Sequence, residues 1–139
     1  LVTYAQGLAQ LHTASKEYNY ELNLETVAKI WRGGCIIRAS ALEDFRKAFA
    51  AKADLPNLLL DAGIGSTLTE NQTGMRAVVQ FAVQKGIPVA GLMNSLAYFD
   101  AYRSENLPTN LIQAQRDYFG AHTYERIDAT GVFHTQWSE

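Results

Sequence analysis

Apolar side chains recur every three to four residues along most of this chain, the spacing that gives an α-helix one hydrophobic face. The segments that follow this spacing are residues 1–17, 24–31, 41–49, 67–85, 89–104 and 110–119. A shorter helix is expected after Pro56. The first segment is periodic from its first residue and begins with no capping side chain, as a helix cut from a longer one would. The pattern predicts an all-α fold.

Capping residues and glycines mark where several of these helices begin and end. Asn23 is expected to cap the second helix, and Gly86 to close the helix at 67–85. Gly33 and Gly34 interrupt an apolar run, although each glycine costs about 1 kcal/mol relative to alanine inside a helix. Either the helix breaks here, or another backbone approaches closely. We expect one of the two to have a positive φ or to face a neighbouring helix at contact distance.

Residues 63–66, Gly-Ile-Gly-Ser, superficially resemble a phosphate-binding loop. The third glycine of a dinucleotide fingerprint is replaced by Leu68, and no Gly-Lys-Ser/Thr ending follows. We therefore expect a flexible connection before the helix at 67–85, without phosphate binding.

The helix after Pro108 is expected to begin at Thr109 or Asn110 and to present one apolar face. The members of that face are Leu111, Ile112, Gln115, Tyr118 and Phe119. Asp117 is predicted to point toward solvent on the other side. Gly120 is predicted to end the helix in the left-handed conformation.

Arg116 and His122 are the candidate binding residues of this chain. Arg116 lies at the flank of the apolar face, and His122 follows the predicted turn. A guanidinium offers a planar fork of donors suited to phosphate oxygens, and an imidazole adds a donor that charges near neutral pH. Taken alone, an arginine near a helix C-terminus more often serves only as a partner for the helix dipole.

The sequence pattern changes after His122. Residues 123–139 show no helical stripe, include Gly131, and carry the aromatic residues Tyr124, Phe133 and Trp137. We predict a helical domain over residues 1–122 and an extended C-terminal tail over residues 123–139. Such a tail would bury its aromatic side chains against another surface.

Composition narrows the partners and the chemistry. The 139 residues are 47% hydrophobic with a net charge of −2, so neither nucleic acid nor a membrane surface is expected as a partner. No apolar run approaches the roughly 20 residues of a membrane span, and no signal peptide is visible, so a cytoplasmic location is expected. The single cysteine, Cys35, is expected to be a small buried side chain. The three histidines do not share metal-ligand spacing with it.

The run NLIQAQRDYFGAHTYE, residues 110–125, is the most specific stretch of this chain. It closely resembles a signature near the C-terminus of the decarboxylating 6-phosphogluconate dehydrogenase family. IWRGGCIIR, residues 30–38, is a second strong match. Weaker matches lie at residues 4–7, 57–60, 86–89, 102–104 and 131–135. The chain departs from the family pattern at residues 61–73 and 90–94.

The resemblance implies that this chain is one piece of such an enzyme, similar to the second half of its all-helical domain. The intact enzyme would oxidise 6-phosphogluconate with NADP to ribulose 5-phosphate and carbon dioxide, in the pentose phosphate pathway and without a metal. NADP would be bound by an N-terminal domain, because this chain has no dinucleotide fingerprint. The family's lysine base and glutamate acid also have no counterpart here, so no catalytic residue is assigned and the chain alone is expected to be inactive.

The resemblance also gives Arg116 and His122 a role. In the family, these two residues come from one subunit of a homodimer and hold the substrate phosphate in the active site of the other. The alternative is a helical oligomerisation module without catalytic residues. The Arg116/His122 pair distinguishes the two readings, since a pure assembly module does not need two phosphate donors beside a helix end.

Overall fold

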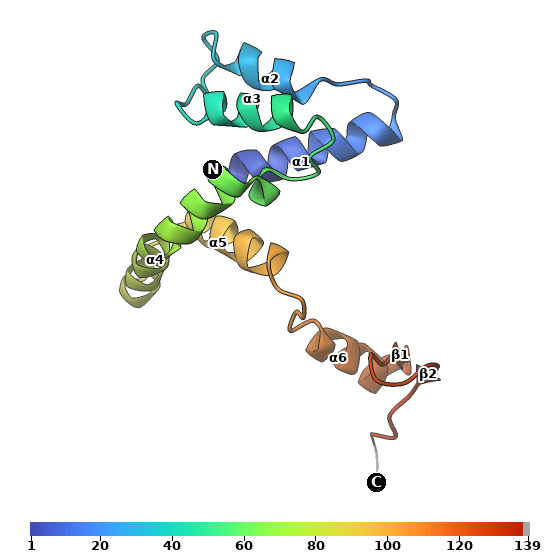
Figure 1. Cartoon of the computed structure of the whole chain (residues 1–139). Helices are drawn as coiled ribbons and strands as arrows, with labels where there is room; N and C mark the ends of the chain where they lie inside the picture. Colours follow the sequence, from blue (N-terminus) through green and yellow to red (C-terminus); the bar gives the residue numbers. More distant parts are fainter. Residues whose placement is uncertain (138–139) are drawn as a thin grey trace. The chain divides into compact units, whose positions relative to one another are not determined.

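The computed structural model describes residues 1–137 and confirms an all-α protein with a very small sheet. In chain order, the elements are α1 (Val2–Glu17), α2 (Leu24–Trp31), α3 (Leu42–Ala51), the 3-10 helix η1 (Leu58–Leu60), α4 (Ala62–Lys85), α5 (Ala90–Tyr102), α6 (Asn110–Gly120), β1 (Tyr124–Glu125) and β2 (Val132–Phe133) (Figure 1). They form two compact units, Leu1–Phe99 and Asp100–Glu139. No helix within residues 1–137 is long and apolar enough to cross a membrane.

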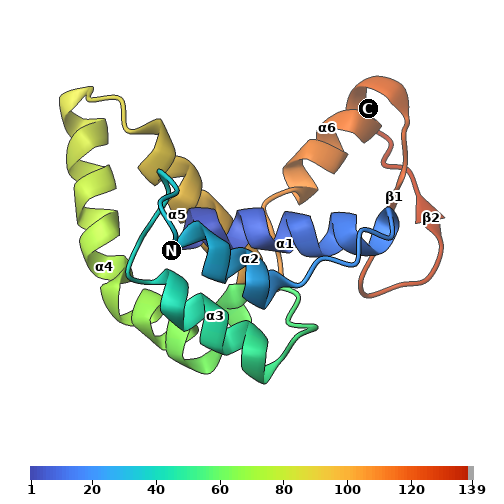
Figure 2. The same ribbon diagram turned by 90° about the horizontal axis from the view of Figure 1, so that it is seen from above.

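The core of the first unit lies where α1, α2, α3 and η1 meet the start of α4. Its buried apolar side chains are Ala5, Leu8, Leu24, Ala28, Leu42, Phe45, Ala48, Phe49, Leu55, Leu58 and Ile64. Helices α2 and α3 pack side by side, and the ring of Phe45 on α3 lies 5.4 Å from the ring of Tyr4 on α1 (Figure 2). The helical spacing of the first three segments predicted these faces correctly.

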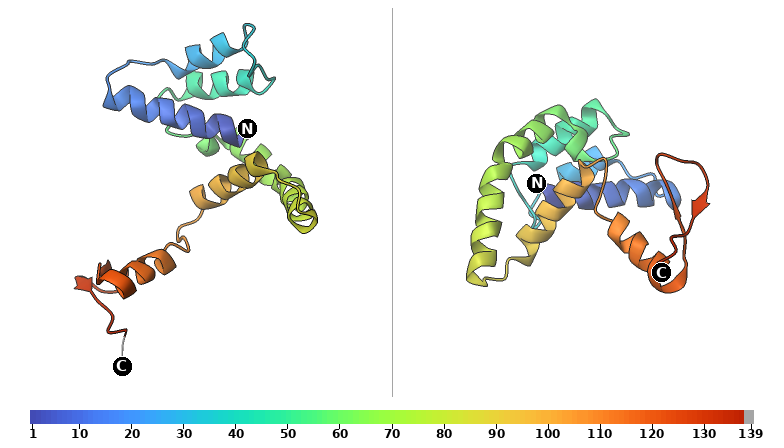
Figure 3. Two further views of the ribbon diagram at one scale, coloured as in Figure 1. Left: turned by 180° about the vertical axis from the view of Figure 1, so that it is seen from behind. Right: turned by 90° about the horizontal axis from the view of Figure 1, so that it is seen from below.

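Helix α5 returns from the far end of α4 toward the start of α1 (Figure 3). There the hydroxyl oxygens of Ser95 and Thr3 lie 3.4 Å apart, and Asn57 Nδ2 donates to the Tyr98 hydroxyl at 2.8 Å. Of the apolar face predicted for residues 89–104, only Phe99 is buried. The helical spacing was therefore correct, but most of this face is not covered.

Two of the predicted caps are present. Asn23 Oδ1 accepts from the Thr26 backbone N–H at 2.8 Å, and Gly86 adopts the left-handed conformation with φ 66° after α4. Gly34 has φ 101°, which confirms that one glycine of the pair takes a positive φ. The apolar run therefore breaks after α2. Cys35 is only half-buried, against the prediction of a buried side chain.

The prediction of a flexible connection at residues 63–66 was wrong, because these residues form the first turns of α4. Asp61 Oδ1 accepts from the backbone N–H groups of Gly63 and Ile64, both at 3.0 Å. This N-cap satisfies two of the free N–H donors of the helix start. A Cβ atom at Gly65 would lie 2.9 Å from the Leu59 carbonyl oxygen, so a close backbone approach explains that glycine.

The second unit contains α6 and a two-strand antiparallel hairpin. Tyr124 pairs with Phe133 in register, and their rings stack with centroids 6.1 Å apart. The predicted tail therefore has extended backbone but folds on itself within this unit. Its last two residues, 138–139, lie outside the described part of the chain. The division between residues 122 and 123 stays a prediction, since the compact units divide after Phe99.

Candidate functional site

Arg116 and His122 both lie at the C-terminal end of α6. Arg116 is exposed, and its Nη1 donates to Gln113 Oε1 at 2.9 Å. His122 is exposed two residues after the helix, with its ring edge-on to Phe119 at a centroid distance of 6.0 Å. The fold thus brings both candidates to one end of one helix. Among residues 1–137, no hydrogen bond or ring contact joins the two side chains directly.

The turn that carries His122 is built differently from the prediction. Ala121, and not Gly120, takes the left-handed conformation after α6, with φ 48°, and Thr123 follows with φ 61°. A Cβ atom at Gly120 would lie 2.6 Å from His122 Nε2, so a larger residue there would displace the exposed imidazole. The imidazole therefore occupies the space above Gly120, and two non-glycine residues with positive φ flank it.

Asp117 was predicted to face solvent, and that prediction was wrong. Its side chain is 0% exposed. Oδ1 accepts from Thr123 N–H at 2.9 Å and from His134 Nδ1 at 2.8 Å. Oδ2 accepts from Thr135 N–H and Trp137 Nε1, each at 2.9 Å. The helical wheel placed Asp117 opposite the apolar face, but the returning chain covers it there.

These donors determine the charge state of Asp117. Burial by itself raises the pKa of a carboxyl group, and hydrogen bonds to the ionised form lower it. Here the donors prevail, led by His134 and followed by the Thr135 amide, so the pKa of Asp117 is held well below its usual range. Asp117 is therefore an ionised, fully hydrogen-bonded hub that ties the hairpin to α6.

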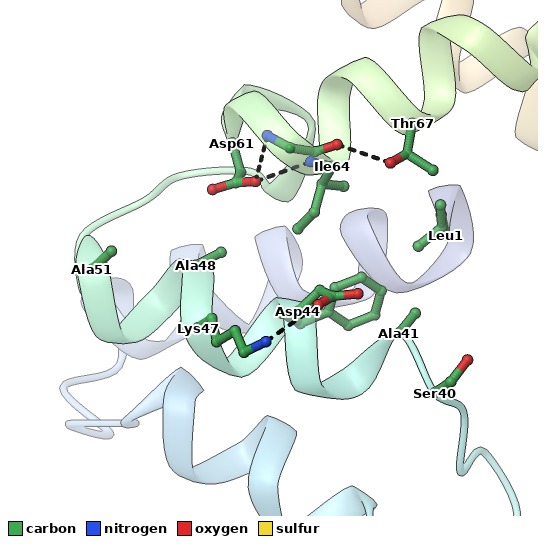
Figure 4. Close-up of a pocket in the computed structure, with 12 residues that line it drawn as sticks. Leu1, Ser40, Ala41, Asp44, Lys47, Ala48, Ala51, Asp61, Ile64 and Thr67 are labelled. Carbon is green, nitrogen blue, oxygen red and sulfur yellow. Dashed lines mark hydrogen bonds and ion pairs between the residues drawn. The ribbon is translucent and has the colours of Figure 1, made fainter.

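A cavity of about 530 Å³ lies between α1, α3 and the start of α4 in the first unit (Figure 4). Several of its polar side chains already have structural partners. Asp61 caps α4, Thr67 Oγ1 donates to the Gly63 carbonyl at 2.9 Å, and Lys47 Nζ lies 3.9 Å from Asp44. Because Asp61 occupies the N–H groups at the start of α4, the structure gives no support to phosphate binding at residues 63–66.

Within 1–137, no group of three or more histidine, cysteine, aspartate or glutamate side chains could hold a metal ion. The strands β1 and β2 form a two-stranded antiparallel hairpin, and the chain has no G-x-G-x-x-G turn. A dinucleotide pocket of the parallel βαβ type needs both a parallel sheet and that turn. The described residues therefore do not form a dinucleotide pocket of that type.

Similarity to known proteins identifies the family of this chain. The family model for the C-terminal domain of 6-phosphogluconate dehydrogenase matches residues 1–137. The chain belongs to this family. The match covers both compact units, including the α6 end that carries Arg116 and His122.

Relatives in the 6-phosphogluconate dehydrogenase family are similar over nearly the whole chain. A decarboxylating enzyme from Lactococcus lactis subsp. lactis is 53% identical over 137 residues, which is 99% of this chain and 29% of the relative. The NADP(+)-dependent, decarboxylating enzyme from Bacillus subtilis is 50% identical over 137 residues, with the same two coverages. The chain thus spans less than a third of the length of these relatives.

A solved structure agrees with the family assignment. The Plasmodium falciparum 6-phosphogluconate dehydrogenase, determined in its apo form and with NADP+ and with 6-phosphogluconate, superposes with a TM-score of 0.87 at 45% identity. The superposition covers 98% of this chain and 29% of that one. The helical arrangement described above is therefore the fold of this part of the family.

Proposed function

We propose that this chain serves as the C-terminal part of an NADP-dependent, decarboxylating 6-phosphogluconate dehydrogenase. The complete enzyme converts 6-phosphogluconate and NADP to ribulose 5-phosphate, carbon dioxide and NADPH, in the pentose phosphate pathway of the cytoplasm. The family match over residues 1–137 is the observation that carries this proposal. NADP binds outside this chain, and the residues described here contribute substrate binding and subunit contacts.

In this function, Arg116 and His122 bind the substrate phosphate. Both are exposed at one helix end, and the hydrogen-bond partner of the Arg116 guanidinium within residues 1–137 is the neutral amide of Gln113. The remaining N–H groups of the guanidinium can donate to phosphate oxygens, and the imidazole adds a further donor. Anchoring a phosphate that does not react positions the carbon that does.

We further propose that the enzyme is a homodimer in which this pair reaches the partner's active site. Four large apolar side chains on α6 support this arrangement, because they are exposed in the isolated chain. They are Leu111, Ile112, Tyr118 and Phe119. A second subunit would cover such a face.

Replacement of Arg116 tests the phosphate-binding role. In the full-length enzyme, Arg116→Ala should raise KM for 6-phosphogluconate and leave KM for NADP unchanged, because the guanidinium contacts only the phosphate. A charge-assisted hydrogen bond contributes about 1.5–3 kcal/mol, so kcat/KM should fall roughly 10- to 200-fold. Arg126→Ala is the matched control, since Arg126 is paired with Asp128 at 2.6 Å in the hairpin. An unchanged KM in Arg116→Ala would contradict the proposal.

A mixed dimer tests whether the pair crosses to the partner. One subunit carries Arg116→Ala, and the other lacks the catalytic base. If the pair crosses, both lesions fall in one active site, and about half the activity survives in the other site. If each subunit uses its own pair, one site carries the Arg116→Ala lesion and the other lacks its base, so kcat/KM of the mixed dimer should fall by about tenfold or more.

The exposed α6 face also supports the second candidate, an oligomerisation module without a substrate role. This function predicts that Arg116→Ala and His122→Ala leave KM for 6-phosphogluconate unchanged. The same kinetic measurements therefore separate the two candidates.

A further inference from the structure

Gln113 links the two candidate phosphate-binding residues. It lies one turn before Arg116 on the same face of α6, the spacing at which helical side chains meet. Its Oε1 accepts from Arg116 Nη1 at 2.9 Å, and its Nε2 donates to the backbone carbonyl of Thr123. Thr123 directly follows His122. One side chain thus holds the guanidinium and the turn that carries the imidazole.

The amide chemistry of Gln113 suits this position. A guanidinium only donates and a carbonyl only accepts, so the side chain between them must offer one acceptor and one donor. Glutamine does so without charge. A glutamate would bind the guanidinium as an ion pair and compete with phosphate for it.

The turn beside Gln113 is held from a second side. The Thr123 N–H donates to the buried carboxylate of Asp117, and the Thr123 carbonyl accepts from Gln113. The Thr123 backbone is therefore bound by two α6 side chains in a left-handed conformation with φ 61°. This holds His122 between Ala121, whose N–H donates to the Asp117 carbonyl at 2.9 Å, and Thr123.

We propose that Gln113 is a positioning residue for substrate binding, which orders Arg116 and His122 before the phosphate arrives. The inference rests on the proposed phosphate-binding role of these two residues. Ordering a long side chain in advance lowers the entropy lost on binding. The effect should therefore appear in the binding of the phosphorylated substrate and not in the chemical step.

The test compares Gln113→Leu with Gln84→Leu in the full-length enzyme. Gln84 is an exposed glutamine of α4, in the other compact unit. Loss of the two hydrogen bonds of Gln113 should raise KM for 6-phosphogluconate about 3- to 10-fold, with kcat and KM for NADP unchanged. Gln84→Leu should leave all three constants unchanged. Gln113→Glu keeps the side-chain size and should also raise KM, which preserves the test if the leucine variant does not fold.

A double-mutant cycle separates positioning from a purely structural role. In an Arg116→Ala/His122→Ala background, Gln113→Leu should change kcat/KM by less than about 2-fold, because the groups it orders are gone. An equally large effect of Gln113→Leu on kcat/KM in that background would overturn the inference. So would an unchanged KM for 6-phosphogluconate in both Gln113→Leu and Gln113→Glu when Arg116→Ala raises that KM. If Arg116→Ala and His122→Ala leave KM for 6-phosphogluconate unchanged, the result contradicts the proposed phosphate site itself.

Discussion

At the scale of single residues, Gly34 shows a constraint that comes from backbone conformation. Its φ is 101°, and a Cβ atom added there would meet nothing within 4 Å. At its neighbour Gly33, the constraint is steric. A Cβ atom at Gly33 would lie 3.3 Å from the Ile30 carbonyl oxygen, a tight contact. Backbone conformation thus favours glycine at position 34, and a tight contact with a neighbouring carbonyl favours it at position 33.

We expect Gly34→Ala to lower the free energy of unfolding by about 1–2 kcal/mol, because a left-handed conformation strains any residue with a Cβ atom. Gly33→Ala should cost less, since the Ile30 carbonyl needs to move only slightly. Gly74→Ala is the control, because Gly74 lies in the open interior of α4 with nothing within 4 Å. It should stabilise the protein by about 0.5–1 kcal/mol. Urea denaturation of the three variants checks this order, and a neutral Gly34→Ala would contradict it.

At the scale of elements, the contact between α6 and the hairpin depends on Asp117. One carboxylate accepts four hydrogen bonds from residues 6 to 20 positions later in the chain. Around it lie few buried apolar residues, and the only side chain of the second unit that is fully buried is Asp117 itself, within residues 1–137. Polar contacts therefore do more to hold this element pair than apolar burial does.

Asp117→Asn should loosen the hairpin without unfolding the first unit. An asparagine turns one acceptor into a donor, so two of the four N–H groups lose their acceptor in either amide orientation. Hydrogen exchange at the Thr123 or Thr135 amide should accelerate about tenfold or more. The exposed Asp128→Asn serves as the control and should leave both amides unchanged. Equal exchange rates of these amides in Asp117→Asn and the native protein would show that Asp117 does not hold the hairpin on α6.

The low pKa of Asp117 predicts how this contact responds to acid. Because the folded pKa lies below the unfolded value of about 3.9, the carboxylate contributes stability above that pH and loses it as pH falls through the folded pKa. The contact between the hairpin and α6 should therefore weaken progressively as pH falls below about 4, and be lost only as pH approaches the much lower folded pKa. Trp137 fluorescence in a Trp31→Phe background reports the change. The Asp117→Asn variant should lack this transition, and an identical transition in both proteins would assign it to other groups.

At the scale of the whole molecule, the exposed apolar face of α6 is the proposed contact between subunits. Leu111 is 77% exposed, although it lies in a run of apolar side chains. Under the proposed homodimer, the partner subunit covers this face. The chain alone leaves it in contact with water, which is unfavourable for large apolar side chains.

Leu111→Glu should weaken the homodimer of the full-length enzyme, because it places a charge in the apolar contact. The dissociation constant should rise by about tenfold or more, as measured by sedimentation equilibrium. Thr130→Glu adds the same charge at the exposed end of the hairpin and should leave the constant unchanged. Equal dimer stability in both variants would place the subunit contact elsewhere.

The sequence by itself determined the features that depend on neighbours within a few residues. Helical periodicity located the helices, and the caps at Asn23 and Gly86 were correctly predicted because they act within one turn. The family was also readable from residues 110–125, and it directed attention to Arg116 and His122. The start of α4 was missed, because the glycines at 63 and 65 outweighed the capping signal of Asp61.

Only the tertiary structure decided which helical faces are covered and which polar groups meet. A helical wheel gives the direction of Asp117 but not the later chain segment that encloses it. Its partners Thr123, His134, Thr135 and Trp137 become neighbours only after the hairpin turns back. The link through Gln113 was missed for the same reason, since its second partner lies beyond the end of the helix. Side-chain spacing is a local property, whereas burial and hydrogen bonding depend on the return path of the whole chain.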